Sequence, residues 1–261
     1  MTAIPPTALK YSGRLARKGI LLEESYRIFT CWDLHQSLRD NITRIRASNP
    51  IGATNEAWLR EVTATISSRF ASGDSLDPLV ILAKGGLPID AWKFCLLWHL
   101  GNSDGMLVAF LSDFLLPKME SGIEVFTAPD VVPFVRELAS ERLLQSSPSA
   151  DAARRIANDL LRCAATFGFL TGRTKKRLAH ATIPEAAVLY AIYSLWEKHQ
   201  SADRMVSSPR WKLFLFRTPQ VEQELLNLHQ FRRLHYERAG SIRELSMPHA
   251  NLMAFAQSLV A

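Results

Sequence analysis

The sequence contains only three cysteines, Cys31, Cys95 and Cys163, which are odd in number and far apart. This pattern argues against a disulfide framework and favours a reducing compartment. The first ten residues include Pro5 and Pro6 and lack the apolar core of a signal peptide. We therefore expect a cytoplasmic protein.

Long apolar runs are also missing. The most apolar tract, residues 91–116, is interrupted at residues 101–105, and neither piece reaches the roughly 20 residues needed to cross a bilayer. With 48% hydrophobic and 21% charged residues, the 261-residue chain has the composition of a globular protein. We expect buried helices in this tract and no membrane contact.

Motifs for catalysis and cofactor binding are absent. The sequence has no glycine-rich phosphate loop with a lysine, no G-x-S-x-G, no H-E-x-x-H and no paired C-x-x-C, and its carboxylates are scattered. Cys95 and His99 stand four residues apart in apolar company, which favours core packing over metal binding. His229 and His235 have a poor spacing for one metal ion, so solvent-facing or capping roles are expected. We therefore expect no enzyme, and no catalytic residue, metal, cofactor or small-molecule substrate.

Apolar residues mostly recur at helical spacing. Leu59, Val62, Ile66 and Phe70, for example, are typical of an amphipathic helix. The spacing and the turn residues between such stretches predict helices from residue 21 and over 32–45, 54–70, 76–83, 88–100, 106–116, from 127, and over 153–167, 184–199, 218–228 and 249–260. Pro117 is expected to end the 106–116 helix, and Thr182–Glu185 predicts a capping box.

The last sixty residues add a different pattern. A short helix is expected over 208–214, and residues 231–237 and 242–247 predict a β-hairpin around Gly240. Helix, short helix, helix and hairpin is the element order of a winged helix. We expect an all-α fold of about ten helices with a small C-terminal β-hairpin and a winged-helix-like C-terminal part.

The net charge of +6 is distributed unevenly. Residues 1–150 carry 15 basic and 16 acidic groups, whereas residues 151–261 carry 16 basic and 9 acidic groups, a net charge of +7. A small polar cluster at residues 145–149 coincides with the change. We expect a near-neutral helical part, 1–147, and a basic part, 148–261, which are compatible with packing as one globule.

An excess of positive charge favours a polyanionic partner, namely DNA, RNA or an acidic protein. The alternative is a solvated basic face without a partner. The densest run places four cations among residues 173–177, where lysine and arginine are typical phosphate contacts. The candidate nucleic-acid contacts are Arg154, Arg155, Arg173, Lys175, Lys176, Arg177, Arg210, Lys212, Arg232 and Arg233.

Two groups of segments carry a resemblance to a known family. The first consists of residues 18–25, with Gly19 and the paired glutamates Glu23 and Glu24, and residues 49–70; the second consists of residues 208–214, 221–228 and 239–245. Together they resemble the BrxA proteins of bacterial BREX phage-exclusion systems, over nearly the whole chain. These motifs are structural rather than chemical.

The resemblance implies a small, mainly helical accessory protein without known catalytic residues. Such a protein works beside a DNA methyltransferase, an ATPase and a phosphatase-like component, and family members are regarded as DNA binders. Some carry an inner-membrane label, which the hydropathy of this chain does not support.

Two functions are therefore compared. The preferred hypothesis is a non-enzymatic DNA-binding component of a phage-defence system, whose basic C-terminal surface contacts the duplex phosphate backbone. The alternative is an interaction adaptor whose basic face docks an acidic partner within the defence complex.

Overall fold

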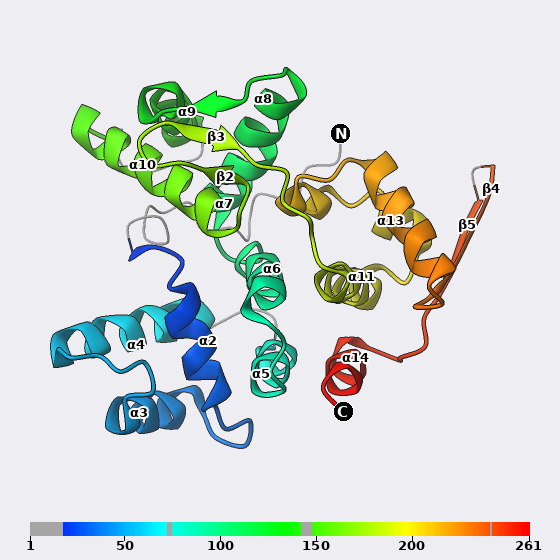
Figure 1. Cartoon of the computed structure of the whole chain (residues 1–261), viewed down its shortest axis with the longest axis horizontal. Coiled ribbons are helices and arrows are strands. Elements are labelled where there is room, and N and C mark those ends of the chain that lie inside the picture. The colour runs from blue at the N-terminus through cyan, green and yellow to red at the C-terminus, as the bar shows by residue number, and fades with distance from the viewer. Residues whose placement is uncertain (1–17, 72–74, 142–147, 241) are drawn as a thin grey trace. The chain divides into compact units, whose positions relative to one another are not determined.

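The computed structural model describes residues 18–71, 75–141, 148–240 and 242–261 (Figure 1). These residues are mainly helical and include two small antiparallel sheets. The expected mainly helical fold with a C-terminal β-hairpin is therefore confirmed. The described residues form two compact units: unit 1 combines Glu23–Trp98 with Ile183–Ala261, and unit 2 combines residues 18–22 with His99–Thr182.

The first segment of unit 1 is a group of helices around an aromatic core. They are α2 (Leu22–Thr30), α3 (Leu38–Ser48), α4 (Glu56–Phe70), α5 (Asp77–Lys84) and α6 (Ile89–Leu100). The apolar stripe of α4 is buried, as its spacing predicts. The ring of Phe29 on α2 lies 5.4 Å from that of Phe70 and 5.8 Å from that of Trp92. These contacts hold α2 against both α4 and α6.

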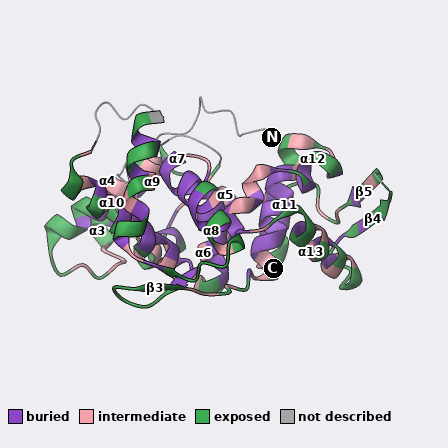
Figure 2. Cartoon of the chain, turned by 90° about the horizontal axis from the view of Figure 1, so that it is seen from above, coloured by how far each residue is buried: buried purple, intermediate pink, exposed green. Residues whose placement is uncertain are grey.

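The second segment of unit 1 contains the C-terminal elements. They are α11 (Glu185–His199), α12 (Ala202–Val206), the 3₁₀ helix η2 (Pro209–Phe214), α13 (Thr218–Gln230), strands β4 (His235–Ala239) and β5 (Ile242–Ser246), and α14 (Leu252–Leu259). Figure 2 shows that α11 is largely buried, whereas the β4–β5 hairpin is mostly exposed. Helix α14 packs against both α5 and α11, so the two segments share one core.

An aromatic cluster also joins the segments of unit 1. The ring of Trp98 on α6 lies 5.4 Å from that of Trp211 and 5.2 Å from that of Phe214, both on η2. The Trp211 indole donates a hydrogen bond of 2.8 Å to the Met205 carbonyl, which satisfies its buried N–H. The tryptophan in this segment therefore belongs to the core.

The C-terminal elements follow the expected order of helix, short helix, helix and hairpin. In the hairpin the register pairs His235 with Ser246 and Ala239 with Ile242. Gly240, which follows the last paired residue of β4, adopts a φ of 63°. Membership of the winged-helix class stays a prediction.

Unit 2 consists of helices and a three-stranded sheet. The helices are α7 (Gly105–Ala109), the π-helix η1 (Phe110–Leu115), α8 (Leu116–Glu120), α9 (Ala128–Glu141) and α10 (Ala150–Thr166); the strands are β1 (Val125–Phe126), β2 (Leu170–Thr171) and β3 (Lys176–Leu178). Strand β3 lies in the centre, antiparallel to β1 and β2. Helix α10 packs against α9 and β2.

Three local predictions are corrected by the structure. The helical path does not end before Pro117 but continues to Glu120. In an α-helix the ring of a proline clashes with the carbonyl four residues earlier, and the π-helix before Pro117 moves that carbonyl away from the ring. Residues 173–177 are not a loop between helices, because Lys176–Leu178 form the central strand of a sheet. The capping box at 182–185 is absent: Pro184 is the N-cap of α11, and no side chain caps this end.

The expected division at residues 147 and 148 is one of charge and stays a prediction. Helices α9 and α10, which lie on either side of that point, pack together in unit 2. Charge is a property of the surface and need not change where the core changes. The polar cluster at 145–149 falls largely outside the described residues.

Within the described part of the chain, no helix combines the length and apolarity needed to cross a membrane.

Candidate nucleic-acid interface

The positive charge of the second half is concentrated in a short part of unit 2. Residues 151–182 carry seven basic and two acidic side chains, a net charge of +5. Residues 183–261 carry nine basic and seven acidic side chains, a net charge of only +2. Most of the excess is therefore on α10, β2, β3 and their connections.

Helix α10 directs part of this charge to solvent. Ser149 caps the helix, since its hydroxyl accepts from the Ala152 amide at 3.2 Å. Arg155 and Arg162 are seven residues apart, which places them on the same side two turns from each other. Both are exposed, while the apolar side of the helix is buried against the rest of unit 2.

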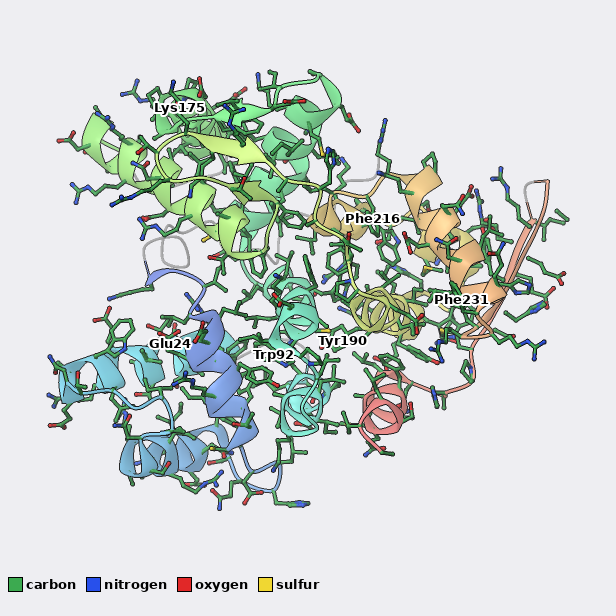
Figure 3. All side chains as sticks on the ribbon, viewed as in Figure 1. Glu24, Trp92, Lys175, Tyr190, Phe216 and Phe231 are labelled. Atoms are coloured by element: carbon green, nitrogen blue, oxygen red, sulfur yellow. The ribbon has the colours of Figure 1, made fainter. Side chains whose placement is uncertain are left out.

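The turn between β2 and β3 holds the rest of the charge. It depends on Gly172, whose φ of +93° is unfavourable for a side chain, and whose added Cβ would lie 2.5 Å from the Lys175 carbonyl oxygen. The Lys176 ammonium donates a 2.7 Å hydrogen bond to the Gly172 carbonyl and closes the turn. Arg173 and Lys175 consequently lie exposed on the turn, where Figure 3 labels Lys175.

A surface pocket of about 300 Å³ lies between α10 and this turn. Its lining residues are Arg155, Asn158, Asp159, Leu161, Arg162, Arg173, Thr174 and Lys176. The one carboxylate in the lining, Asp159, forms an ion pair of 2.8 Å with Arg162. The pocket thus has room and charge for a phosphate group. Sequence patterns do not single out Asn158 or Thr174, because uncharged polar residues carry no spacing signal.

Five exposed cations of this region make no ion pair with any described carboxylate. We call them the α10–β3 basic surface: Arg154, Arg155, Arg173, Lys175 and Arg177. Because no described carboxylate pairs with them, these cations are open to counterions, which phosphate contacts displace. The structure brings these predicted contacts together within one unit.

The other predicted contacts lie in unit 1 and are more constrained. Arg210 stacks 4.7 Å over the Trp98 ring and donates a 2.9 Å hydrogen bond to the Trp98 carbonyl, which gives it a structural role. Arg233 forms a 2.7 Å ion pair with Glu185. Lys212 is half-buried, and Arg232 is exposed.

The hairpin arginines are neutralised within unit 1. Arg243 contacts Glu222 at 2.6 Å and Asp203 at 2.7 Å, and Arg238 contacts Glu222 at 2.6 Å. The bonds to Asp203 and Glu222 raise the pKa of Arg243 above its ordinary value. The charge excess of the sequence therefore overstates what the hairpin offers to a polyanion.

In the predicted winged-helix order of elements, α13 would be the helix that many members of that class use to contact DNA. Its thirteen residues include Glu222 and Glu224 but no lysine or arginine. A negatively charged helix is repelled by DNA phosphates. The α10–β3 basic surface is therefore the better candidate interface.

The residues considered as metal ligands behave as structural groups. Cys95 and His99 are both buried, and burial raises the pKa of the Cys95 thiol above its ordinary range. His229 accepts a hydrogen bond of 3.2 Å from the Tyr236 amide. Among the residues that the structure describes, no group of three or more histidine, cysteine or acidic side chains could hold a metal ion.

Comparison with known proteins gives one match. The model of the family named BrxA matches residues 9–192, more than half of the chain. The matched range includes the α10–β3 basic surface and ends within α11. No curated protein and no solved structure matches the chain.

Proposed function

The chain belongs to the BrxA family and thus takes part in BREX phage defence, and we propose that it acts there as a non-enzymatic component that binds duplex DNA. The observation that carries this proposal is the α10–β3 basic surface, whose five cations lack described acidic partners. Lysine and arginine side chains in this state bind DNA by displacing the counterions condensed on its phosphates.

The geometry favours contact with the backbone rather than with bases. The cations lie on α10, on the β2–β3 turn and on β3, and the adjacent pocket of about 300 Å³ suits one phosphate. Asn158 and Thr174 add neutral polar groups to that pocket. Sequence preference is accordingly weak or supplied by other defence components.

The test is fluorescence anisotropy on a duplex over a salt series. We compare the native chain with the triple variant Arg173→Gln, Lys175→Gln and Arg177→Gln. Each lost phosphate contact lowers the steepness of the plot of log affinity against log salt by about 0.9, so we expect a fall of up to about 3.

A matched control removes the same charge elsewhere. Arg27→Gln, Arg39→Gln and Arg60→Gln lie exposed on α2, α3 and α4 of unit 1, and this triple variant has the same net charge as the test variant. We expect it to keep most of the native salt dependence. Equal losses in the two variants, or no duplex binding by the native chain at low salt, would contradict the proposal.

A second candidate function is an adaptor that docks an acidic surface of another defence component. It is favoured by apolar residues beside the cations: Val125 is 38% exposed and pairs with Arg177 in the sheet, and Ile123 is 37% exposed. Mixed apolar and basic surfaces suit protein interfaces. The candidate partners are the methyltransferase, the ATPase and the phosphatase-like protein.

Affinity capture with and without nuclease separates the two functions. Complexes that survive nuclease and are lost in Val125→Ser favour the adaptor. Complexes that disappear with nuclease favour DNA binding.

A further inference from the structure

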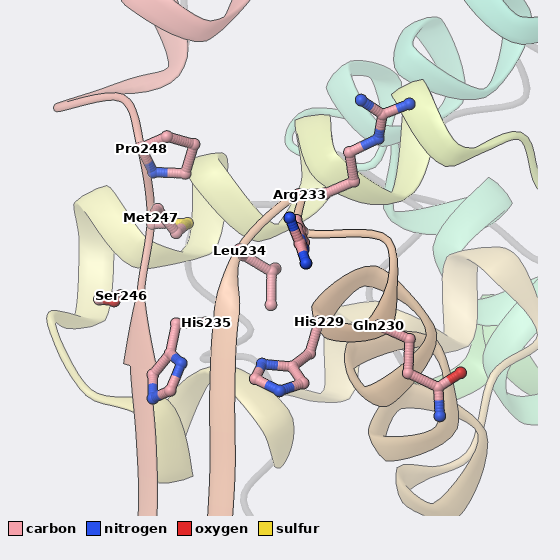
Figure 4. A pocket seen from close by; sticks show the side chains of 9 residues that line it. His229, Gln230, Arg233, Leu234, His235, Ser246, Met247 and Pro248 are labelled. Carbon is pink, nitrogen blue, oxygen red and sulfur yellow. The ribbon is translucent and has the colours of Figure 1, made fainter.

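A second pocket, of about 680 Å³, lies in unit 1 between the end of α13 and the open end of the β4–β5 hairpin (Figure 4). Its lining residues are His229, Gln230, Arg232, Arg233, Leu234, His235, Ser246, Met247 and Pro248. Two arginines and two histidines thus line it, and none of these residues is acidic. The volume is within the range of small-molecule sites.

A hydrogen bond determines the tautomer of His229. The Tyr236 amide donates to Nδ1 of His229 at 3.2 Å, so Nδ1 carries a lone pair and Nε2 carries the proton of the neutral ring. His229 can therefore donate a hydrogen bond from Nε2. A metal ion at Nε2 would require the opposite tautomer and would break the bond from Tyr236. This histidine is suited to an anion rather than to a metal.

The second histidine extends the polar wall. The ring centroid of His235 lies 5.1 Å from that of His229, and Nε2 of His235 lies 3.3 Å from the Glu237 carboxylate. His235 pairs with Ser246 across the two strands, so an imidazole and a hydroxyl lie side by side on the hairpin. Both groups can form hydrogen bonds to phosphate oxygens.

The positive charge of the pocket comes mainly from Arg232. This residue has a φ of 58°, in the left-handed region that non-glycine residues rarely adopt, and its amide donates to the His229 carbonyl at 2.9 Å. Arg232 is exposed and makes no ion pair with a described carboxylate. Arg233, by contrast, is held by Glu185 at 2.7 Å.

The remaining lining residues indicate what the anion is attached to. A volume of about 680 Å³ exceeds the space that a phosphate fills, and Leu234, Met247 and Pro248 provide an apolar surface beside the polar wall. Imidazole rings are also common stacking partners of nucleobases. A ligand with a phosphate attached to a flat, partly apolar ring system matches a pocket with one polar and one apolar wall.

We propose that this pocket binds a phosphorylated nucleoside, either as a free mononucleotide or as the 5′-phosphorylated end of a strand. Arg232 and Nε2–H of His229 contact the phosphate, and the base lies against Met247 and Pro248. This site is distinct from the α10–β3 basic surface and does not depend on duplex binding.

Calorimetric titration of the full chain with thymidine 5′-monophosphate and with thymidine tests the proposal. Two variants remove the phosphate contacts with little effect on the backbone. Arg232→Asn keeps a residue that tolerates the left-handed region, and His229→Asn keeps an oxygen acceptor for the Tyr236 amide while removing Nε2–H. We expect each to weaken monophosphate binding about tenfold, and thymidine to bind at least about tenfold more weakly than the monophosphate.

Arg204→Gln is the control, because it removes an exposed cation of α12 outside the pocket. We expect no change in monophosphate affinity. Absence of saturable binding, equal binding of thymidine, or unchanged binding in both pocket variants would overturn the proposal. Since neither pocket variant alters the α10–β3 basic surface, their duplex affinity reports separately on the proposed function.

Strand ends distinguish the two sources of the ligand. A single strand with a 5′-phosphate is compared with the same strand bearing a 5′-hydroxyl. A preference for the phosphorylated strand that disappears in Arg232→Asn assigns the pocket to strand ends. Equal binding of both strands, together with monophosphate binding, assigns it to free nucleotides.

Discussion

Glu222 on α13 is joined to both strands of the β4–β5 hairpin through Arg238 and Arg243. One oxygen of its carboxylate accepts hydrogen bonds from Arg243 Nη2 at 2.6 Å and Nε at 2.9 Å, and the other accepts from Arg238 Nη1 at 2.6 Å. Glu222→Gln removes the charge with little change in volume. Both arginines then lose the negative charge that they share, although Arg243 keeps Asp203 at 2.7 Å.

The side-chain exposures set the size of the effect. Glu222 is 14% exposed and Arg243 is 20% exposed, whereas Arg238 is 49% exposed. Exposed ion pairs contribute at most about 1 kcal/mol, and removal of one partner from a buried pair costs about 3–5 kcal/mol. The exposure of this network lies between these two cases. We therefore expect the free energy of local unfolding of the hairpin to fall by about 2 kcal/mol.

Hydrogen exchange is the suitable assay, because the chain contains two compact units and one global free energy of unfolding is not defined for it. A loss of about 2 kcal/mol corresponds to about 30-fold faster exchange of amides in β4 and β5. Glu23→Gln is the control, since its pair with Arg27 is long, at 3.8 Å, and both side chains are more than half exposed. A change of less than about threefold in Glu222→Gln would refute the reasoning.

Three further predictions concern separate sites. Gly172→Ala should strain the β2–β3 turn by about 1–3 kcal/mol, because Cβ meets the Lys175 carbonyl oxygen; duplex affinity should fall although no charge is lost. Burial raises the pKa of Glu224, so folding is favoured at low pH and loses stability as the pH rises through the raised pKa. Glu224→Gln should therefore stabilise unit 1 near neutral pH, by less than about 1 kcal/mol, and give no gain below about pH 4, as measured by hydrogen exchange of α13 amides against the native chain at each pH. Nitrogen-detected NMR near pH 8 should show His229 as the Nε2–H tautomer; the Nδ1–H tautomer would contradict the hydrogen bond from Tyr236.

The helical part of the fold could be predicted because its signals are local. The apolar residues of α4 and α10 recur every three or four positions, and the same residues are buried in the structure. The β4–β5 hairpin is equally local, with alternating residues on each side of Gly240. Predictions of this kind depend only on neighbours within a few turns or one hairpin.

The sheet of unit 2 could not be predicted for the opposite reason. Its strands contain two or three residues, too few to show an alternating pattern. The pairing of Val125 with Arg177 joins residues that are far apart in sequence, so the residues near either one do not indicate it. Residues 173–177 consequently suggest a charged loop, although their second half is the central strand.

Charge shows a further limit of sequence reasoning. Arg173 and Arg243 contribute equally to the net charge of the C-terminal part, and both occur in basic clusters. Only the fold distinguishes them, because it brings Glu222 and Asp203 to Arg243 and no described carboxylate to Arg173. A count of charges therefore identifies the half of the chain that holds a candidate interface, but not the surface itself.

The same distinction makes Glu222→Gln informative about function. If internal pairing is what keeps the hairpin from contacting DNA, breaking the pairs should make Arg238 available to phosphate, while Arg243 remains with Asp203. The variant should then bind duplex DNA with a salt dependence steeper by about one phosphate contact. The triple variant of Arg173, Lys175 and Arg177 should show the same increase from its lower starting value, because the two surfaces act independently. An unchanged salt dependence in Glu222→Gln would mean that the hairpin does not approach DNA even when its charge is released.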